Sequence, residues 1–138
     1  MVWAIGEHGD LSVPLLDRVT VNGSRVELTP EQAAVALDYF RNWYVRHVAL
    51  DSGRSSTWTS GYALARMVSA LDGPGELWPA SVVLDGEYGI AGVAVSVPVT
   101  LGACGVELIH EWELAPSDLA ALHASAQYVR TAVESSEA

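Results

Sequence analysis

A histidine lies between two glycines and two carboxylates near the start of the chain, in the segment Gly6-Glu7-His8-Gly9-Asp10. Glycines on both sides let the backbone adopt an unusual turn and leave the imidazole accessible. The acidic neighbours favour the protonated imidazolium. Such a histidine can give a proton to a carbonyl oxygen and take it back from a hydroxyl, which is general acid–base chemistry. On the pentapeptide alone, an ordinary solvent-exposed loop histidine is the simpler interpretation.

The other reactive side chains give weaker signals. The single cysteine, Cys104, lies between strand-like segments, and a buried inert thiol is a better interpretation than a nucleophile. The remaining histidines do not have the spacing of a metal site, and we expect none. Of these, His47 lies near an apolar helical stripe and is interpreted as packed, whereas His110 is interpreted as part of a solvated strand end.

The net charge argues against several partners. The 138 residues carry a formal charge of −10 at pH 7, and all seven positive side chains are arginines. No basic face for nucleic acid can be built from them, and no Schiff-base or P-loop lysine exists. The longest apolar stretch, 91–106, contains Pro98 and three glycines, so we expect no membrane span. One cysteine permits no internal disulfide, which fits a reducing compartment, and we expect a cytoplasmic location.

Half of the residues are apolar, and this has two interpretations. Either the composition is simply rich in alanine and valine, or part of the surface is covered by another domain or subunit. A chain of this length can bury roughly 68% of its unfolded surface. We therefore expect one domain with its own core, spanning residues 1–138.

A short strand and a hairpin are predicted around the histidine segment. Residues 2–5 are predicted to form a buried strand that runs into the loop of His8. Residues 15–21 and 25–28 are predicted to form a hairpin around Asn22-Gly23, a strong turn pair.

A helix is predicted to begin after this hairpin. Thr29 is a good N-cap, Pro30 suits the first helical position, and Gln32 completes a capping box with Thr29. Apolar residues then recur at helical spacing and predict one buried stripe, made of Val35, Ala36, Tyr39, Phe40, Trp43, Tyr44, His47 and Val48.

The second half of the chain changes its hydrophobic period from helical to two. A polar loop is predicted over 51–57 and a helix over 60–71. Strands are predicted at 81–84, 93–97 and 106–110. The last element is a helix from Pro116 to about Thr131, whose buried face is made of Leu119, Leu122, Ala126 and Val129. These elements predict an α/β fold of the α+β type, in which helices pack on a mostly antiparallel sheet without a Rossmann domain.

Three segments together resemble the C-terminal domain of the NAD-dependent lactate/malate dehydrogenases. The first is Gly6–Asp10 directly after a strand, followed by Ser12-Val13-Pro14. The second is the glycine-punctuated strand pair from Leu84 to Ile90 and from Val97 to Glu107. The third is the last helix, with Ser125-Ala126 at its centre. The matches occur in family order and cover nearly the whole chain.

The resemblance implies specific roles for two residues. His8 would be the acid/base that moves the hydroxyl proton of a 2-hydroxy acid while NAD takes the hydride. The segment 54–61 is similar to the family stretch that lines the substrate pocket, and the register from Trp58 and Gly61 assigns the pocket residue as Ser56. A shift of one residue would make it Ser55 or Thr57 instead, and these hydroxyls also suit a helix N-cap.

The resemblance also implies that part of the enzyme is elsewhere. The family's NAD-binding half, the aspartate that orients the histidine and the arginine that clamps the substrate carboxylate are all expected outside these 138 residues. No G-x-G-x-x-G motif is present. We therefore expect the chain alone to be inactive, with an NAD-binding domain or subunit as its partner and a homo-oligomeric state. The residues do not distinguish lactate from malate.

Two other functions remain open on the residues alone. The first is a stand-alone oligomerisation or interaction module on the dehydrogenase scaffold, with His8 no longer catalytic. The second is a small-molecule binder that uses the residual pocket.

Overall fold

The computed structural model describes residues 1–53, 57–73 and 75–136 and builds them around one long strand, β6 (Ala91–Gly102). This strand is the centre of a three-stranded antiparallel sheet, between β5 (Glu76–Asp85) and β7 (Gly105–Ile109). Val82 lies opposite Val95, and Thr100 lies opposite Leu108. Alternate side chains of β6 are buried because successive residues of a strand point to opposite faces. They form the centre of the core: Val93, Val95, Val97, Val99 and Leu101.

The predicted strands are confirmed in place, although each is longer or shifted at its ends. β5 begins five residues before the predicted 81–84, at Glu76. The loop between β5 and β6 contains a short 3-10 turn, η2 (Glu87–Gly89). Cys104 lies in the two-residue turn between β6 and β7 and is exposed. The prediction of a buried thiol is therefore wrong, because a tight hairpin turn at the edge of the sheet faces solvent.

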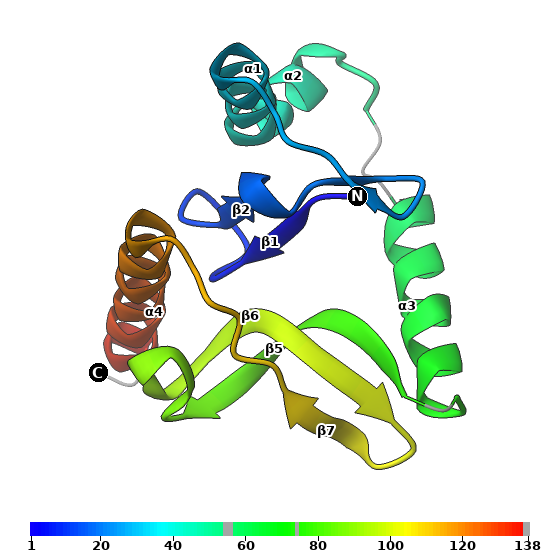
Figure 1. Ribbon diagram of the computed structural model, residues 1–138, viewed down its shortest axis with the longest axis vertical. Helices are drawn as coiled ribbons and strands as arrows, with labels where there is room; N and C mark the ends of the chain where they lie inside the picture. Colours follow the sequence, from blue (N-terminus) through cyan, green and yellow to red (C-terminus); the bar gives the residue numbers. More distant parts are fainter. Residues whose placement is uncertain (54–56, 74, 137–138) are drawn as a thin grey trace.

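A second layer is formed by the antiparallel pair β1 (Trp3–Ile5) and β2 (Val13–Leu15). Ile5, Val13 and Leu15 are buried in the same core as β6. Figure 1 shows this pair between the three-stranded sheet below and the first two helices above. The strand predicted at 2–5 is thus confirmed from Trp3 onward.

The hairpin around Asn22-Gly23 is confirmed but is shorter than predicted. Its strands are β3 (Thr20–Val21) and β4 (Ser24–Arg25). Asn22 has φ 52° and Gly23 has φ 80°, so both turn residues adopt the left-handed conformation that a two-residue hairpin needs. The residues before it form a 3-10 turn, η1 (Leu16–Arg18), and not the start of a long strand.

The predicted first helix is divided in two, α1 (Pro30–Arg41) and α2 (Trp43–Ala49). Its capping box is confirmed: the Gln32 N–H donates to Thr29 Oγ1 at 3.3 Å, and the Thr29 N–H donates to Gln32 Oε1 at 2.9 Å. The division lies at Asn42, whose φ of −104° and ψ of 10° are not helical.

The prediction that the stripe of α1 and α2 is buried is wrong. No residue of either helix is buried, and Val35 and Tyr39 are 71% and 66% exposed. Helical spacing shows that one face is apolar, but it does not show what covers that face. Ala36, Phe40 and His47 are half-buried, and the other residues of the stripe are exposed.

Two further helices flank the sheet at opposite ends, α3 (Thr57–Leu71) and α4 (Pro116–Ser136) (Figure 1). The predicted inner face of α4 is confirmed, since Leu122 and Ala126 are buried and Leu119 and Val129 pack against the core. In contrast, α3 contacts the core mainly through its last turns, where Ala70 is buried. It begins before the predicted residue 60, and the loop predicted at 51–57 lies partly outside the described residues.

Candidate functional site

The loop that carries His8 is joined to the central strand at its first residue. Gly6 pairs with Ser96 of β6 through two backbone hydrogen bonds, each of 2.8 Å. Gly6 has φ 94°, which side-chain-bearing residues rarely adopt. The chain can therefore leave β1 and turn sharply at the point where β6 holds it.

Glu7 then organises the rest of the loop. Its backbone N–H donates to the hydroxyl of Ser125 on α4 at 2.6 Å, and its carboxylate accepts the N–H of Leu11 at 2.7 Å. A Cβ at Gly9 would lie 2.7 Å from the same carboxylate, so a larger residue there would require the Glu7 side chain to move. Ser12 completes the turn by donating its N–H to the carbonyl of Gly9 at 3.1 Å.

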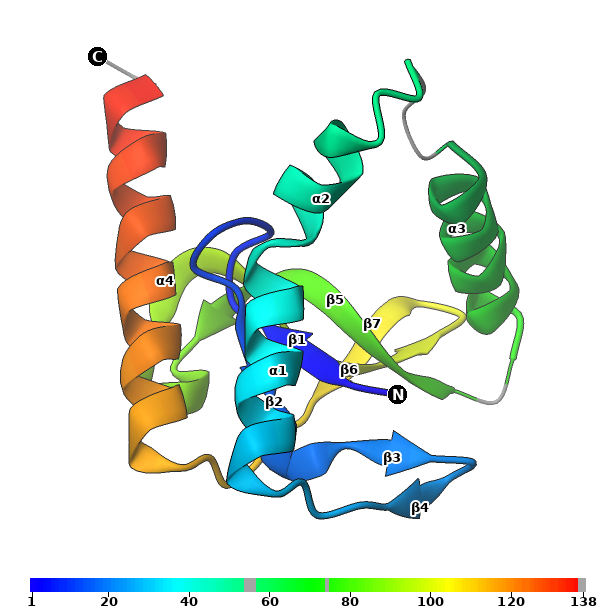
Figure 2. The same cartoon turned by 90° about the horizontal axis from the view of Figure 1, so that it is seen from above.

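His8 lies exposed on this loop and faces a cavity of about 730 Å³. The wall opposite the loop is formed by aromatic residues at the junction of α1 and α2. Figure 2 shows the loop between β1 and β2 placed between this junction and α4. The residues that line the cavity are Ala4, His8, Gly9, Asp10, Ser12, Phe40, Arg41, Trp43 and Tyr44.

The charged groups of this cavity are Asp10 and Arg41. Arg41 supplies the positive charge among the lining residues, and within the described part of the chain its guanidinium has no hydrogen-bond or ion-pair partner. A free guanidinium is suited to a carboxylate, which it can bind with two parallel hydrogen bonds. The cavity thus combines an acid/base group, an anion-binding group and apolar walls.

The histidine has no orienting carboxylate among the described residues. Glu7 is its neighbour in sequence, but the Glu7 carboxylate is engaged with the Leu11 N–H. Asp10 lines the same cavity without a hydrogen bond to the imidazole.

The second predicted site residue, Ser56, lies outside the described residues, as does Ser55. Thr57 is the first residue of α3. The structure therefore brings His8 together with Arg41 and Asp10, and it does not test the predicted contact of Ser56 with a substrate.

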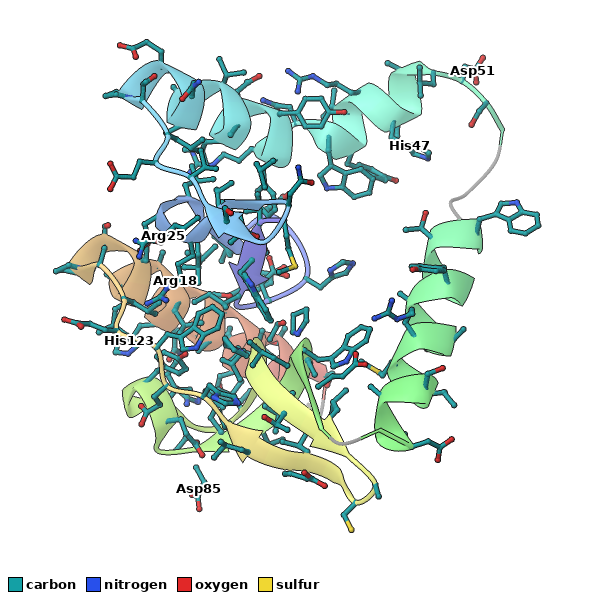
Figure 3. The ribbon with its side chains drawn as sticks, turned by 45° about the vertical axis from the view of Figure 1, so that its right-hand side comes forward. Arg18, Arg25, His47, Asp51, Asp85 and His123 are labelled. Atoms are coloured by element: carbon teal, nitrogen blue, oxygen red, sulfur yellow. The ribbon has the colours of Figure 1, made fainter. Side chains whose placement is uncertain are left out.

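The other histidines play structural parts. His47 is half-buried, with its ring centroid 6.1 Å from that of Trp43, as predicted for a packed residue (Figure 3). His110 is also half-buried, and its Nε2 lies 2.7 Å from the Thr100 hydroxyl. The prediction of a solvated strand end is therefore wrong for His110 itself, although Glu111 and Glu113, which follow it, are exposed. Among the described residues, no cluster of three or more potential metal ligands occurs. No helix in the described ranges is both long and apolar enough to cross a membrane.

Two site residues were not predicted. Arg41 gave no signal in the sequence, since it occupies an ordinary helical position. Ser125 was noted only as part of a family-like segment, and its contact with Glu7 joins residues 118 positions apart.

A sequence model of the lactate/malate dehydrogenase α/β C-terminal domain matches residues 1–138. The chain belongs to this family. The malate dehydrogenase of Halobacterium salinarum is 38% identical over 130 residues, which cover 90% of this chain and 42% of that protein. The malate dehydrogenase of Nitratiruptor sp. is 38% identical over 133 residues, covering 94% of this chain and 42% of its own length.

Solved structures agree with this family assignment. The malate dehydrogenase of Salinibacter ruber superposes with a TM-score of 0.88 at 31% identity, covering 97% of this chain and 45% of that one. The malate dehydrogenase of Aeropyrum pernix gives a TM-score of 0.86 at 26% identity, with 97% and 46% covered. The lactate/malate dehydrogenase C-terminal domain formed by this chain thus spans less than half the length of these relatives, and the predicted α/β class with antiparallel sheets is confirmed.

Proposed function

We propose that this chain supplies the proton-transferring, substrate-binding part of an NAD-dependent 2-hydroxy acid dehydrogenase, with His8 as the acid/base. The observation that carries the proposal is the position of His8, which is exposed on a braced loop and faces the cavity that Arg41 also lines. A cavity of about 730 Å³ is within the range of small-molecule sites.

The proton step follows from this arrangement. When the substrate is oxidised, its hydroxyl proton passes to the imidazole of His8, and in reduction the imidazolium returns it to the carbonyl oxygen. The family resemblance implies a carboxylate-clamping arginine outside this chain; Arg41, which lines the cavity with His8, would add a second positive group that holds the carboxylate and keeps the hydroxyl carbon near His8. Ser56 would contribute a further contact to the substrate.

NAD would accept the hydride in the complete enzyme. This chain does not offer a fitting site for it, because the sequence has no G-x-G-x-x-G turn between a strand and a helix. The dinucleotide is therefore assigned to another domain or subunit, and the chain alone is expected to be inactive.

The exposed apolar surface supports such a partner. Val35 and Tyr39 of α1 line a groove of about 650 Å³ together with Val2 and Leu16. Trp58 and Tyr62 of α3 are also exposed. An apolar surface of this extent is typical of an interface. The names of the relatives favour malate as the substrate.

The test joins this chain to the part of the Salinibacter ruber malate dehydrogenase that it does not cover, and measures NADH formation with malate and with lactate. We expect turnover, and we expect His8→Asn to lower kcat by roughly 10²- to 10⁴-fold. His123→Gln is the matched control, since His123 is exposed and contacts the backbone of Tyr88. Full activity of the His8→Asn protein would contradict the proposal. Turnover by the 138-residue chain alone would contradict the need for a partner.

A non-catalytic oligomerisation module is the second candidate, and the exposed apolar faces of α1 and α3 favour it. In that case the joined protein would be inactive, while light scattering would show that the 138-residue chain assembles into a defined oligomer.

A further inference from the structure

We propose that Ser125 is a positioning residue for His8, acting through the peptide group between Gly6 and Glu7. This inference rests on the proposed function. Ser125 lies on α4 and is fully buried, with 0% of its surface exposed. Its hydroxyl accepts the N–H of Glu7 at 2.6 Å, and Glu7 directly precedes His8.

Both polar atoms of that peptide group are bonded to different elements. Its carbonyl oxygen, on Gly6, accepts the N–H of Ser96 in β6 at 2.8 Å. Its N–H, on Glu7, donates to Ser125 in α4. A peptide group is planar, so hydrogen bonds to both its N–H and its carbonyl oxygen fix its orientation. The chain therefore enters Glu7 and His8 in a fixed direction.

A steric fit adds to these bonds. A Cβ at Gly6 would lie 2.6 Å from the Ser125 hydroxyl oxygen and 3.2 Å from the Ser125 Cβ. Gly6 also has φ 94°, which disfavours other residues. The glycine and the serine therefore occupy complementary positions, and the loop approaches α4 closely here.

The hydroxyl is not explained by the helix itself. Serine has lower helix propensity than alanine, and a buried hydroxyl is costly unless it is hydrogen-bonded. The neighbouring buried residues of α4, Leu122 and Ala126, are apolar. Alanine at position 125 would suit both the helix and the core. The hydrogen bond with the Glu7 N–H is therefore the feature that serine provides here and alanine would not.

The test compares Ser125→Ala with Leu122→Val in the 138-residue chain by NMR. Leu122→Val weakens the packing of the same helix but leaves the hydroxyl in place. We expect Ser125→Ala to speed hydrogen exchange of the Glu7 amide by roughly tenfold more than it speeds the exchange of core amides, which exchange only through global unfolding. We also expect the χ1 coupling constants of His8 to move toward rotamer averaging. Leu122→Val should lower the urea midpoint and change neither signal.

A paired substitution tests the steric fit. Gly6→Ala alone should disturb the His8 couplings more than Ser125→Ala does, because the new methyl group meets the hydroxyl. Adding Ser125→Ala to Gly6→Ala should restore part of the wild-type signal. Unchanged Glu7 exchange and His8 couplings in Ser125→Ala would overturn the inference, whereas a lack of restoration would show that the φ of 94° at Gly6, and not the contact with the hydroxyl, excludes alanine there.

Kinetics of the joined enzyme link position to chemistry. We expect Ser125→Ala to lower kcat with little change in KM, whereas a loss of stability alone would lower the amount of active enzyme and leave its kcat per folded molecule unchanged. If His8→Asn stops turnover but Ser125→Ala keeps the wild-type kcat, the inference is wrong. If His8→Asn remains fully active, the proposed function fails, and the NMR signals alone decide the role of Ser125.

Discussion

Tyr88 donates a hydrogen bond of 2.7 Å from its hydroxyl to the carbonyl oxygen of His110, which lies 22 residues later in the chain. The same hydroxyl accepts the N–H of Trp112 at 2.9 Å. The Tyr88 backbone is bonded at both ends as well, since its N–H donates to Glu111 and its carbonyl accepts the His123 ring N–H at 2.7 Å. Figure 3 shows His123 on α4 at this junction. One residue thus joins η2, the segment after β7 and the last helix.

Replacing Tyr88 by phenylalanine should destabilise the chain. The substitution keeps the ring but leaves the His110 carbonyl and the Trp112 N–H without their partner, which costs about 1–3 kcal/mol. Urea unfolding should show a lower midpoint with an unchanged slope. Tyr128→Phe is the control, because Tyr128 is exposed, and it should change the free energy of unfolding by less than about 0.5 kcal/mol. Equal effects of the two substitutions would show that the hydroxyl contacts do not matter.

The same tyrosine should make stability depend on alkaline pH. Burial raises the pKa of Tyr88 above the ordinary value of 10.0, and the charge of Glu111 raises it further. Because the neutral phenol is favoured in the folded state, its contribution is complete below the pKa of the unfolded chain and is lost as pH rises through the folded pKa. The free energy of unfolding should therefore fall more steeply with pH for the wild type than for Tyr88→Phe. The measurement covers pH 9 to 12, which brackets the ordinary tyrosine pKa of roughly 10.

Asp118 should oppose stability at neutral pH. Burial at the start of α4 raises the pKa of its carboxyl, and the nearby charge of Asp17 raises it further. The protonated form is favoured in the fold, so stability is lost as pH rises through the raised folded pKa. Asp118→Asn should therefore raise the thermal midpoint at pH 7, where the carboxyl group is charged. Near pH 3, below the ordinary aspartate pKa of roughly 4, the carboxyl group is protonated and the substitution should have little effect. A lower midpoint at pH 7 would contradict this.

The face of α1 that lines the groove with Val2 and Leu16 should tolerate polar residues that the core does not. Val35→Ser changes an exposed side chain and should alter the free energy of unfolding by less than about 0.5 kcal/mol. Tyr39→Ser also removes the contact of the ring with the Arg46 guanidinium, 4.9 Å from the ring centroid, and should cost up to about 1 kcal/mol. Leu122→Ala, in the core, should cost about 2–5 kcal/mol. In the joined enzyme the two surface substitutions should instead weaken assembly or activity. A large loss of stability in the isolated chain would show that this face is packed within it.

Local signals in the sequence predicted local structure well. The Asn22-Gly23 turn, the capping box of Thr29 and Gln32 and the inner face of α4 all depend on residues a few positions apart. In each case the residue types satisfy the backbone or the core on their own. The α/β class followed because the hydrophobic period changes from helical to two along the chain.

Long-range relations were not predictable from spacing. The contact of Ser125 with Glu7 depends on how α4 packs against the loop, and nothing near either residue indicates it. The exposure of Val35 depends on what lies beside α1. An apolar stripe specifies a preference for burial, whereas the partner that satisfies this preference is a property of the whole assembly. For the same reason Arg41 was not predicted, since it is a candidate site residue only because it lines the same cavity as His8.

The uncovered faces of α1 and α2 also bear on the behaviour of the chain in solution. The molecule carries a net charge of −10, so neighbouring copies repel one another at low ionic strength. The screening length falls from about 10 Å in 0.1 M salt to about 3 Å in 1 M salt, and apolar attraction is then no longer opposed at short range. A rise in ionic strength therefore weakens the charge repulsion that opposes contact between these apolar faces in two copies of the chain.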